Sequence, residues 1–468
     1  MTGKRKRKLA MPDTLIIVAS VVLLVAILSW IIPSGTYDYQ EMNINGRIRN
    51  VAIDGTYHTI DKSEVTTTGF LGFFSVLYRG CVEAADVIFM ILCCCGTFGV
   101  VVKTGAFHAG IGTILKKLKG KEILLVPIIM MIFGLGGSVF GMASEFYGFY
   151  PLIVGLGVAL GYDAMFGFAI IAVGEFVGFM GATLNPYSVG IAQTISGVEL
   201  YSGTGYRAIC FVIFMAISII YVMVYGRKIK KNPGASVVFG EKNIHAFDRD
   251  ELNEYSFTLK DGLVLLDVLV VLVVLMLGLI KWGWDFPQLC GLFLLMSMIA
   301  AAICKWSPNK WGSEFIDSAK TAMWGCILTG IAKAITVVMQ DAQIMDTVIY
   351  GLSNVLKNAP HAVSAQVMLV VQTLINFFIP SATGQASATM PIMAQLADII
   401  GVSRQTAVLA FQFGDGLSNI FWPTADIVII CGLGGISLQK WYKWFTPLFL
   451  ILFVTQAILL GIATGIGF

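Results

Sequence analysis

The chain has 468 residues, of which 57% are hydrophobic and only 13% are charged, and its mean hydropathy is +0.81. Soluble globular proteins carry about 25% charged residues, so the composition excludes this class and indicates a polytopic, all-α membrane protein. The net charge of +3 is small, and the distribution of charge along the chain is more informative than its sum.

The first apolar run, 15–32, follows five consecutive basic residues at 4–8. It has no small-residue cleavage site, so we interpret it as an anchor rather than a cleaved signal peptide. A basic tail beside a first span belongs on the cytoplasmic side of a cytoplasmic (inner) membrane. A basic tail in isolation could bind nucleic acid. Beside a hydrophobic span, it more readily sets the orientation of that span in the membrane, and we expect no nucleic-acid partner.

Nine cysteines show no metal-ligand spacing, and Cys93, Cys94 and Cys95 lie side by side in an apolar run, where they are best explained as small packing residues. The chain also lacks a P-loop, so ATP does not drive it directly. We therefore expect no cofactor, and no ion beyond a coupling Na⁺ or H⁺.

A span of about 20 apolar residues crosses the hydrocarbon core, and the positive-inside rule fixes the direction of each crossing. The first half is predicted to begin with an outward span (15–32), a polar external segment (33–78) and an inward span (84–102). A surface helix (108–121), a re-entrant hairpin (about 123–160), an outward crossing (164–195) and a return (206–226) follow. The hairpin must open to the cytoplasm, because only then do the basic residues at 227–231 end inside.

A cytoplasmic loop, 227–260, precedes the second half. That half is predicted to begin with three spans (263–280, 289–303 and 319–339) and a surface helix (342–357). A hairpin on the outer side (about 363–400), an inward crossing (405–435) and a last span that ends outside (445–466) follow. The two hairpins then enter from opposite faces, which is an inverted-repeat topology.

The predicted organisation has six parts: a basic tail (1–10), first transmembrane helices (11–102), repeat 1 (103–226), the loop (227–260), scaffold helices (261–340) and repeat 2 (341–468). Residues 151–175 align with 391–415 at a constant offset of 240, so that Glu175 matches Asp415. A duplicated, Gly/Pro-interrupted membrane element with an acid in each copy is typical of secondary transporters.

Irregular backbone deep in a membrane is tolerated only where it is buried in protein or lines a wet cavity. The hairpin tips, 136–145 and 380–389, are therefore predicted at the substrate site, and each begins a half-helix whose N–H groups attract an anion. We expect the carboxylate and backbone amine of the solute to be held by polar residues of the tips and breaks: Ser144, Ser381, Thr383, Gln385, Asn185 and Asn419. Flexible packing of small residues is the alternative for either tip alone.

Glu145, Glu175 and Asp415 lie in apolar segments, where a charge is costly. We predict that they receive the cationic group of the solute or a coupling ion. Lys333 is the deep base available to pair with one of them, and Asp426 lies just behind a helix break.

Two further breaks, 181–188 and 418–424, expose carbonyls next to proline. They supply candidate Na⁺ ligands near Thr183, Asn185, Ser418 and Asn419. Phe146, Tyr147 and Trp422 are suited to stacking on a guanidinium or to ordinary core packing.

Two anion-attracting helix ends and a surplus of carboxylates favour a solute with one carboxylate and one or two amines. The predicted function is secondary transport of an amino acid, cationic in type (arginine, ornithine or lysine), by exchange or ion coupling. The alternative is a Na⁺- or H⁺-coupled carrier of peptides, dicarboxylates or other organic anions.

At these positions the chain resembles the YfcC-like family of basic amino acid antiporters, within the ion transporter superfamily. The resemblance covers nearly the whole chain and is strongest at 11–14, 31–35, 181–186, 380–391 and 411–416. It implies a homodimer in which each protomer has a scaffold domain and an elevator-type transport domain that holds both hairpins. Na⁺-dicarboxylate carriers of the superfamily have Ser-Asn-Thr at their tips, whereas this chain has Ser381-Ala382-Thr383, which argues against a dicarboxylate and against Na⁺ coupling by that motif.

Other functional classes fit less well. The 227–260 loop is too short for a signalling domain, which argues against a receptor, and saturable counterflow would argue against a channel. An enzyme is not expected, because the four histidines, His58, His108, His245 and His361, all fall in predicted loops or surface helices.

Overall fold

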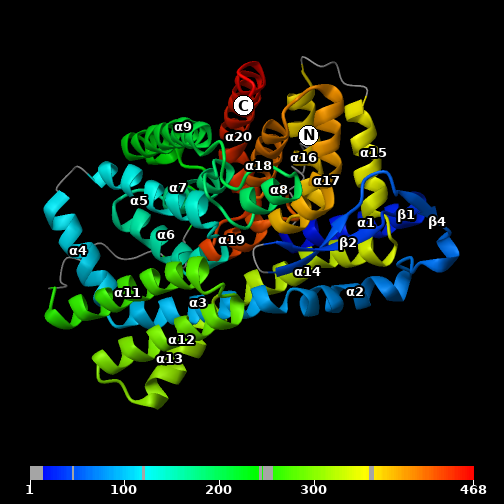
Figure 1. Cartoon of the computed structure of the whole chain (residues 1–468). Coiled ribbons are helices and arrows are strands. Elements are labelled where there is room, and N and C mark those ends of the chain that lie inside the picture. Colours follow the sequence, from blue (N-terminus) through cyan, green and yellow to red (C-terminus); the bar gives the residue numbers. More distant parts are fainter. Residues whose placement is uncertain (1–13, 45–46, 119–121, 242–244, 246–256, 358–362) are drawn as a thin grey trace, which may run out of the picture.

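The computed structural model describes residues 14–44, 47–118, 122–241, 245, 257–357 and 363–468. The basic tail, the start of the 11–14 motif and His361 lie outside these residues. Within the described chain, eight helices are long and apolar enough to cross a membrane, and helices make up nearly all of the fold (Figure 1). The chain is therefore an all-α polytopic membrane protein in its main architecture.

The first half contains the helices α1 (Thr14–Ile31), α2 (Phe70–Glu83), α3 (Ala85–Lys103), α4 (Ala106–Leu118), α5 (Leu125–Leu135), α6 (Phe149–Ala159), α7 (Ala164–Met180), α8 (Val189–Ile195) and α9 (Thr204–Lys231). The second half contains α11 (Leu259–Lys281), α12 (Phe286–Ile303), α13 (Pro308–Lys320), α14 (Met323–Asp341), α15 (Met345–Lys357), α16 (Ser364–Phe378), α17 (Ala382–Ile400), α18 (Arg404–Ser418), α19 (Asp426–Gly434) and α20 (Leu438–Gly465). The observed helices agree with the predicted helical segments to within a few residues at most ends, although α20 begins at Leu438, before the predicted start at 445.

Each of the two segments predicted to form a hairpin contains two helices joined by a short break. Hairpin 1 consists of α5 and α6, joined by a π-type turn over Gly136–Phe140 and a 3-10 turn over Ser144–Phe146. Hairpin 2 consists of α16 and α17, and its break is shorter than predicted: α17 already begins at Ala382, capped by the Ser381 hydroxyl, which accepts a hydrogen bond from the Gly384 N–H. Residues 382–389 are therefore helix rather than open tip.

The predicted breaks of the crossing helices are also present. The first separates α7 from α8 and the second separates α18 from α19. Gly174 and Gly414, which match in the repeat, occupy equivalent places. A Cβ on Gly174 would lie 3.0 Å from Met130 Cα of α5, and one on Gly414 would lie 2.8 Å from Gln372 Cβ of α16. In both repeats, a glycine thus lets the broken helix approach the first hairpin helix.

Two ribbons and two helices were not predicted. The 33–78 segment contains two antiparallel ribbons, in which β1 (Ser34–Thr36) pairs with β4 (His58–Ile60) and β2 (Tyr39–Ile44) pairs with β3 (Arg47–Ala52). Helix α2 follows within the same segment and leads almost directly into α3 (Figure 1). Helix α13 precedes α14 and packs on α3.

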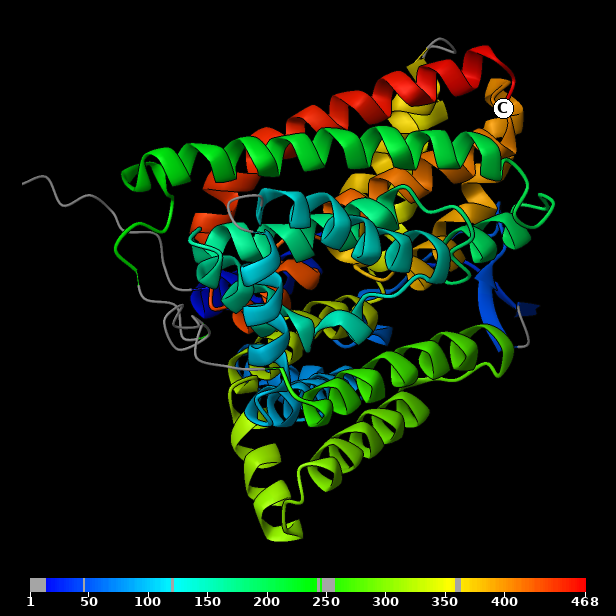
Figure 2. The ribbon, with the colours of Figure 1, turned by 90° about the vertical axis from the view of Figure 1, so that its left-hand side faces the viewer.

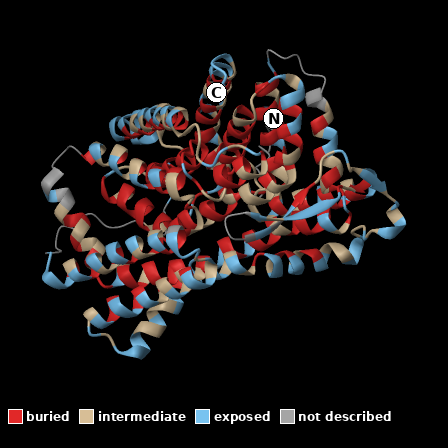
Figure 3. Ribbon diagram, viewed as in Figure 1, coloured by how far each residue is buried: buried red, intermediate tan, exposed pale blue. Residues whose placement is uncertain are grey.

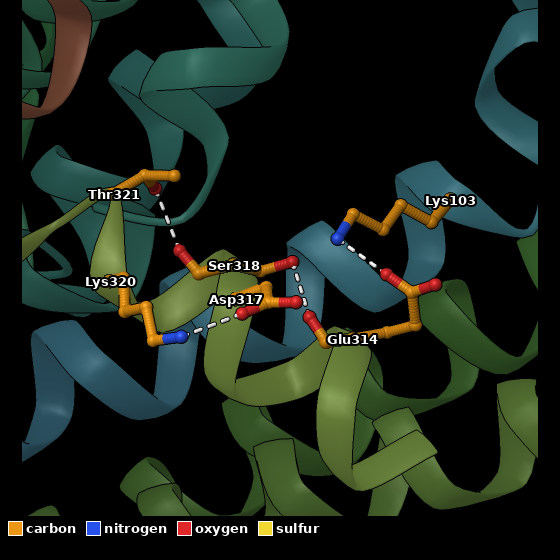
Figure 4. Close-up of polar contacts among 6 residues, drawn as sticks. All are labelled: Lys103, Glu314, Asp317, Ser318, Lys320 and Thr321. Carbon is orange, nitrogen blue, oxygen red and sulfur yellow. Dashed lines mark hydrogen bonds and ion pairs between the residues drawn. The ribbon is translucent and has the colours of Figure 1, made fainter. Parts of the chain in front are cut away.

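The helices α1, α2, α3, α11, α12, α13 and α14 form a group that we call the scaffold group. Its closest contact is between α3 and α13, where a Cβ on Gly99 would lie 2.1 Å from Ser318 Cβ. Figure 4 shows that this contact is bordered by an ion pair of 2.5 Å between Lys103 Nζ and Glu314 Oε2. Within α13, Lys320 pairs with Asp317 at 2.8 Å.

The two repeats form the other group, which we call the hairpin group. Every residue of α7 is buried, and so is α18 from Thr406 to its end, and Figure 3 shows this buried centre enclosed by partly exposed helices. The long helices α9 and α20 lie side by side along one edge (Figure 2), joined by a hydrogen bond of 2.9 Å from Tyr221 Oη to the Trp444 carbonyl. The scaffold helices α11, α12 and α13 lie on the opposite side in that view.

Candidate functional site

A cavity of about 490 Å³ separates the scaffold group from the hairpin group. We call it the central cavity. On the scaffold side it is lined by Glu83, Ala84, Val87, Phe286, Thr329, Ala332, Lys333, Thr336 and Gln340, and Met345 at the start of α15 also contributes to the lining. On the hairpin side it is lined by Ala143, Ser144, Tyr147, Ile379, Pro380, Ser381, Gly384, Thr424, Ala425, Asp426 and Ile429. Both hairpin tips and the second helix break therefore meet at one cavity, as the repeat pattern predicted.

Among the described residues, three ionisable side chains other than tyrosine line this cavity: Glu83 at the end of α2, Lys333 in the middle of α14, and Asp426 at the start of α19. Within the described residues, Lys333 makes no ion pair. Lys333 was a candidate partner for a deep acid, but its side chain lines the cavity instead. The two acids and one base give the lining a net formal charge of −1.

Hairpin 1 is fastened to the break of its own repeat. Ser138 Oγ donates to the Gly181 carbonyl and lies 3.1 Å from Thr183 Oγ1. Asn185 is fully buried, and its Oδ1 accepts from the Tyr187 and Ser188 N–H groups at 2.9 and 3.2 Å. These contacts hold the first tip in place, so Thr183 and Asn185 position the tip without lining the central cavity themselves.

The two acids of repeat 1 lie behind the cavity. Glu145 Oε2 accepts from the Ala143 N–H at 3.0 Å and so helps to fold the tip. Glu175 is fully buried, and its Oε2 accepts from Tyr150 Oη at 2.8 Å. Its Oε1 has no hydrogen-bond partner among the described residues.

Repeat 2 carries a denser polar cluster. Asn376 Nδ2 lies within 3.1 Å of three oxygens, those of Gln385, Asp415 and Asn419, with distances of 3.1, 2.9 and 3.1 Å. Gln385 Nε2 in turn donates to Gln372 Oε1 at 2.7 Å. An amide nitrogen has only two hydrogens, so one of the three oxygens is left for another partner. Asp415 Oδ2 has none among the described residues.

Each hairpin is also linked to the helix break of the other repeat. Tyr147 Oη of hairpin 1 donates to Asp426 Oδ1 at 2.8 Å, and Thr383 Oγ1 of hairpin 2 donates to the Tyr187 carbonyl at 2.9 Å. The broken helices cross where a Cβ on Gly416 would lie 2.4 Å from Met180 Cα. The two repeats therefore form one interlocked unit.

The predicted site residues fall into three groups. Ser144 and Ser381 line the central cavity, and Thr383 lines a second cavity with Ser381. The others lie beneath the cavity surface in the two polar clusters: Glu145, Glu175, Asn185, Gln385, Asp415 and Asn419. Ser418, named as a candidate ion ligand, donates instead to the Gly414 carbonyl within its own helix.

Sequence reasoning missed Glu83, because the helix that ends there was not predicted. It also missed Asn376, Gln372 and Tyr150, since a single polar residue in an apolar helix gives no signal of which acid it will contact. Asp426 and Tyr147 were each recognised from the sequence. Their hydrogen bond joins the two repeats, and the spacing of residues along the chain does not predict it.

Comparisons with known proteins identify the family of the chain. The sequence profile described as "DcuC: C4-dicarboxylate anaerobic carrier" matches residues 11–465. The Escherichia coli (strain K12) protein named "Putative basic amino acid antiporter YfcC" is 32% identical over 100% of this chain and 99% of its own length. An uncharacterised protein of Haemophilus influenzae is 27% identical over 99% of both chains.

Two solved transporters also align over nearly their full lengths. Alcanivorax borkumensis YdaH is 14% identical, with a TM-score of 0.43, and the alignment covers 98% of this chain and 99% of that one. Neisseria gonorrhoeae MtrF is 16% identical, with a TM-score of 0.43, and the alignment covers 97% of this chain and 96% of that one. The profile match over almost the whole sequence decides the family. The chain belongs to the DcuC family, and it is a multi-pass membrane transporter, not an enzyme.

Proposed function

We propose that this protein is a secondary transporter of amino acids with a cationic side chain, and that the solute binds in the central cavity. The observation that carries the proposal is the charge of the lining. A cationic amino acid has two positive groups and one carboxylate, and the cavity offers two acids, Glu83 and Asp426, and one base, Lys333.

In this proposal Lys333 holds the solute carboxylate, and hydroxyls of Ser144 and Ser381 add hydrogen bonds. Asp426 takes one amine while Tyr147 keeps its carboxylate oriented. The exposed Glu83, on the scaffold side, takes the other positive group. Charged groups at these positions attract a solute of opposite charge more strongly than in water, because the surroundings are apolar.

The alternative is a carrier of C4-dicarboxylates, which is what the family description names. A dicarboxylate would meet two acids and a single lysine, without an arginine among the lining residues to clamp either carboxylate. The balance of charge therefore favours the cationic amino acid. The name of the Escherichia coli relative agrees with this choice.

We further propose that a cation, Na⁺ or H⁺, couples to transport at the cluster around Asn376. Three oxygens converge there on one amide nitrogen, and Asp415 contributes a carboxylate without a second partner among the described residues. Carboxylate and amide oxygens are suitable ligands for a hard cation. Asn419 is one of these ligands, whereas Thr183 and Asn185 hold the tip of hairpin 1.

An elevator-type motion is supported by the position of the cavity between two groups of helices. The interlocked hairpin group would move as one body past the scaffold group, taking Asp426 and both tips away from Lys333 and Glu83. A homodimer with a cytoplasmic N-terminus and an external C-terminus is part of the same proposal.

The test is counterflow in proteoliposomes. Vesicles loaded with unlabelled L-arginine should accumulate labelled L-arginine, and unlabelled L-lysine or L-ornithine should compete with it. Succinate and fumarate should not compete. Accumulation of labelled succinate without any arginine counterflow would overturn the substrate class in favour of the dicarboxylate alternative.

A further inference from the structure

A second cavity, of about 460 Å³, lies between the β2–β3 ribbon and hairpin 2. It is lined by Tyr39, Ile48 and Asn50 of the ribbon, and by Ser381, Thr383, Gly384, Ser387 and Ala388 at the start of α17. We call it the outer cavity. Ser381 and Gly384 also line the central cavity, so the tip of hairpin 2 is the boundary between the two.

The ribbon is anchored to α15 next to this boundary. Asp346 accepts hydrogen bonds from Tyr39 Oη at 2.7 Å and from the Tyr37 N–H at 3.0 Å. Tyr57, next to β4 of the neighbouring ribbon, stacks on Tyr350 of the same helix with ring centroids 4.1 Å apart. Burial and the Asp346 carboxylate raise the pKa of Tyr39, so its phenol remains a neutral donor. The outer cavity thus has a fixed wall on the ribbon side.

The face of the ribbon that borders the outer cavity follows from its register. Glu41 pairs directly with Asn50, and Tyr39 precedes Glu41 by two residues, so these three side chains belong to one face of the ribbon. Glu41 is exposed. Together with the hydroxyls of Thr383 and Ser387, this face presents oxygen acceptors and an aromatic ring, and none of the described residues that line the cavity is basic.

We propose that the outer cavity is a second binding site, where a cationic amino acid is held before it passes the tip of hairpin 2 into the central cavity. This inference rests on the proposed function. The amine or guanidinium group is received by Glu41, Asn50 and the ring of Tyr39, as expected for a cation beside a carboxylate and an aromatic face.

The tip itself is suited to admit a solute. Ser381 is exposed, and Gly384 has no Cβ to narrow the boundary. The break consists of Ile379, Pro380 and Ser381 alone, so a small change of backbone there joins the two cavities. The ribbon, which is fixed to α15, does not have to move for this to occur.

The first experiment measures the chemistry of the outer cavity without any substrate. Ser387→Cys is made in a background in which the partly exposed Cys81, Cys93, Cys290 and Cys304 are replaced by serine. Labelling by membrane-impermeant thiol reagents, one cationic and one anionic of the same size, is compared in intact cells and inverted vesicles. We expect the cationic reagent to react about threefold faster or more, from one side of the membrane.

Glu41→Gln should remove most of that preference. Glu64→Gln, which neutralises another exposed acid of the same external segment, is the matched control and should leave it unchanged. Equal rates for the two reagents, or the same loss with Glu64→Gln, would overturn the proposed chemistry of the site.

The second experiment separates the outer site from the central one. L-Arginine should slow the labelling of Ser387→Cys, and this protection should persist when Asp426→Asn is added, because Asp426 lines only the central cavity. Protection that disappears with Asp426→Asn would overturn the outer site and leave the proposed function standing. Arginine counterflow by the unmodified chain is measured in parallel, and its absence would refute the proposed function itself.

Discussion

Tyr147, in hairpin 1 of the first repeat, donates a hydrogen bond of 2.8 Å to Asp426, which begins α19 in the second repeat. Both residues line the central cavity. Tyr147 is almost fully buried, so its phenol has little freedom to turn elsewhere, and it fixes the orientation of the carboxylate. This contact joins a hairpin tip to the helix break of the opposite repeat at the point where we place the substrate amine.

The first prediction concerns this pair. Asp426→Asn should weaken L-arginine binding much more than Tyr147→Phe, to an affinity that high L-arginine concentrations can still measure, because it removes a charge that the amine needs. Tyr147→Phe should weaken binding by about tenfold, the usual scale for one hydrogen bond to a charged group. The double variant should be no worse than Asp426→Asn alone, since the two act through one contact. Thermal stabilisation of the purified protein by L-arginine measures all three, and additive losses would contradict the coupling.

The second prediction concerns Lys333. Lys333→Gln should remove the preference for L-arginine over agmatine, which lacks the carboxylate but keeps both cations. The unmodified protein should prefer L-arginine by about tenfold or more. Lys333→Arg, which keeps the charge, is the control and should retain most of the preference. Equal loss of arginine and agmatine binding in Lys333→Gln would show that Lys333 has a structural role instead.

The third prediction concerns the coupling cation. Na⁺ should raise the thermal stability of the protein relative to choline at equal ionic strength, because a ligand that binds only the folded state stabilises it. Asp415→Asn should abolish this response. Glu175→Gln should keep it, since Glu175 has the Tyr150 hydroxyl as a partner rather than a converging set of oxygens. If none of the proteins responds to Na⁺ and only Asp415→Asn loses a pH dependence that the unmodified protein and Glu175→Gln share, the coupling ion is a proton bound at Asp415.

The fourth prediction concerns packing within repeat 1. A Cβ on Gly178 would lie 2.1 Å from the Gly134 carbonyl oxygen, a backbone atom that cannot turn aside. Gly178→Ala should therefore destabilise the protein, by about 1–3 kcal/mol on the scale of overpacked cores. Gly351→Ala, in α15, is the matched control, since a Cβ there meets nothing within 4 Å, and it should be neutral or slightly stabilising. Thermal unfolding in detergent compares the two, and equal melting temperatures would contradict the close contact.

The fifth prediction concerns pH. His245, in the segment between the two halves, lines a cavity at the α3–α13 contact with Lys103 and Asp317. Burial lowers the pKa of His245 to about 4 from its ordinary value of 6.5. Between these values the unfolded chain binds a proton that the folded chain does not, so stability should fall as the pH drops from about 6.5 towards 4. His245→Gln should reduce this fall, and an identical pH profile in the variant would contradict the assignment.

The sequence predicted the helices and hairpins because their signals are local. Apolar length fixes each span, proline and glycine fix the breaks, and the matched Gly174 and Gly414 reflect the same close approach in both repeats. The ribbons were not predicted, because the strands β1 to β4 are only three to six residues long and lie in a polar segment without strong alternation. Helix α2 was missed because its 14 residues are too few to cross a membrane.

The candidate site was predicted only in part. The sequence indicated the hairpin tips, and Ser144 and Ser381 do line the central cavity. It could not show which acids face that cavity, because Glu175 and Asp426 look alike as isolated carboxylates in apolar surroundings. The difference arises from tertiary contacts: Glu175 points to Tyr150 inside the hairpin group, whereas Asp426 lies at a helix start that opens towards Lys333.

The measurement that tests the central claim most directly is counterflow of labelled L-arginine in proteoliposomes, compared between the unmodified protein and Asp426→Asn. We predict saturable accumulation by the unmodified protein, competed by L-lysine, and none by Asp426→Asn at equal reconstitution. Succinate transport that depends on Lys333 and is unchanged in Asp426→Asn would contradict the account and assign the central cavity to a dicarboxylate.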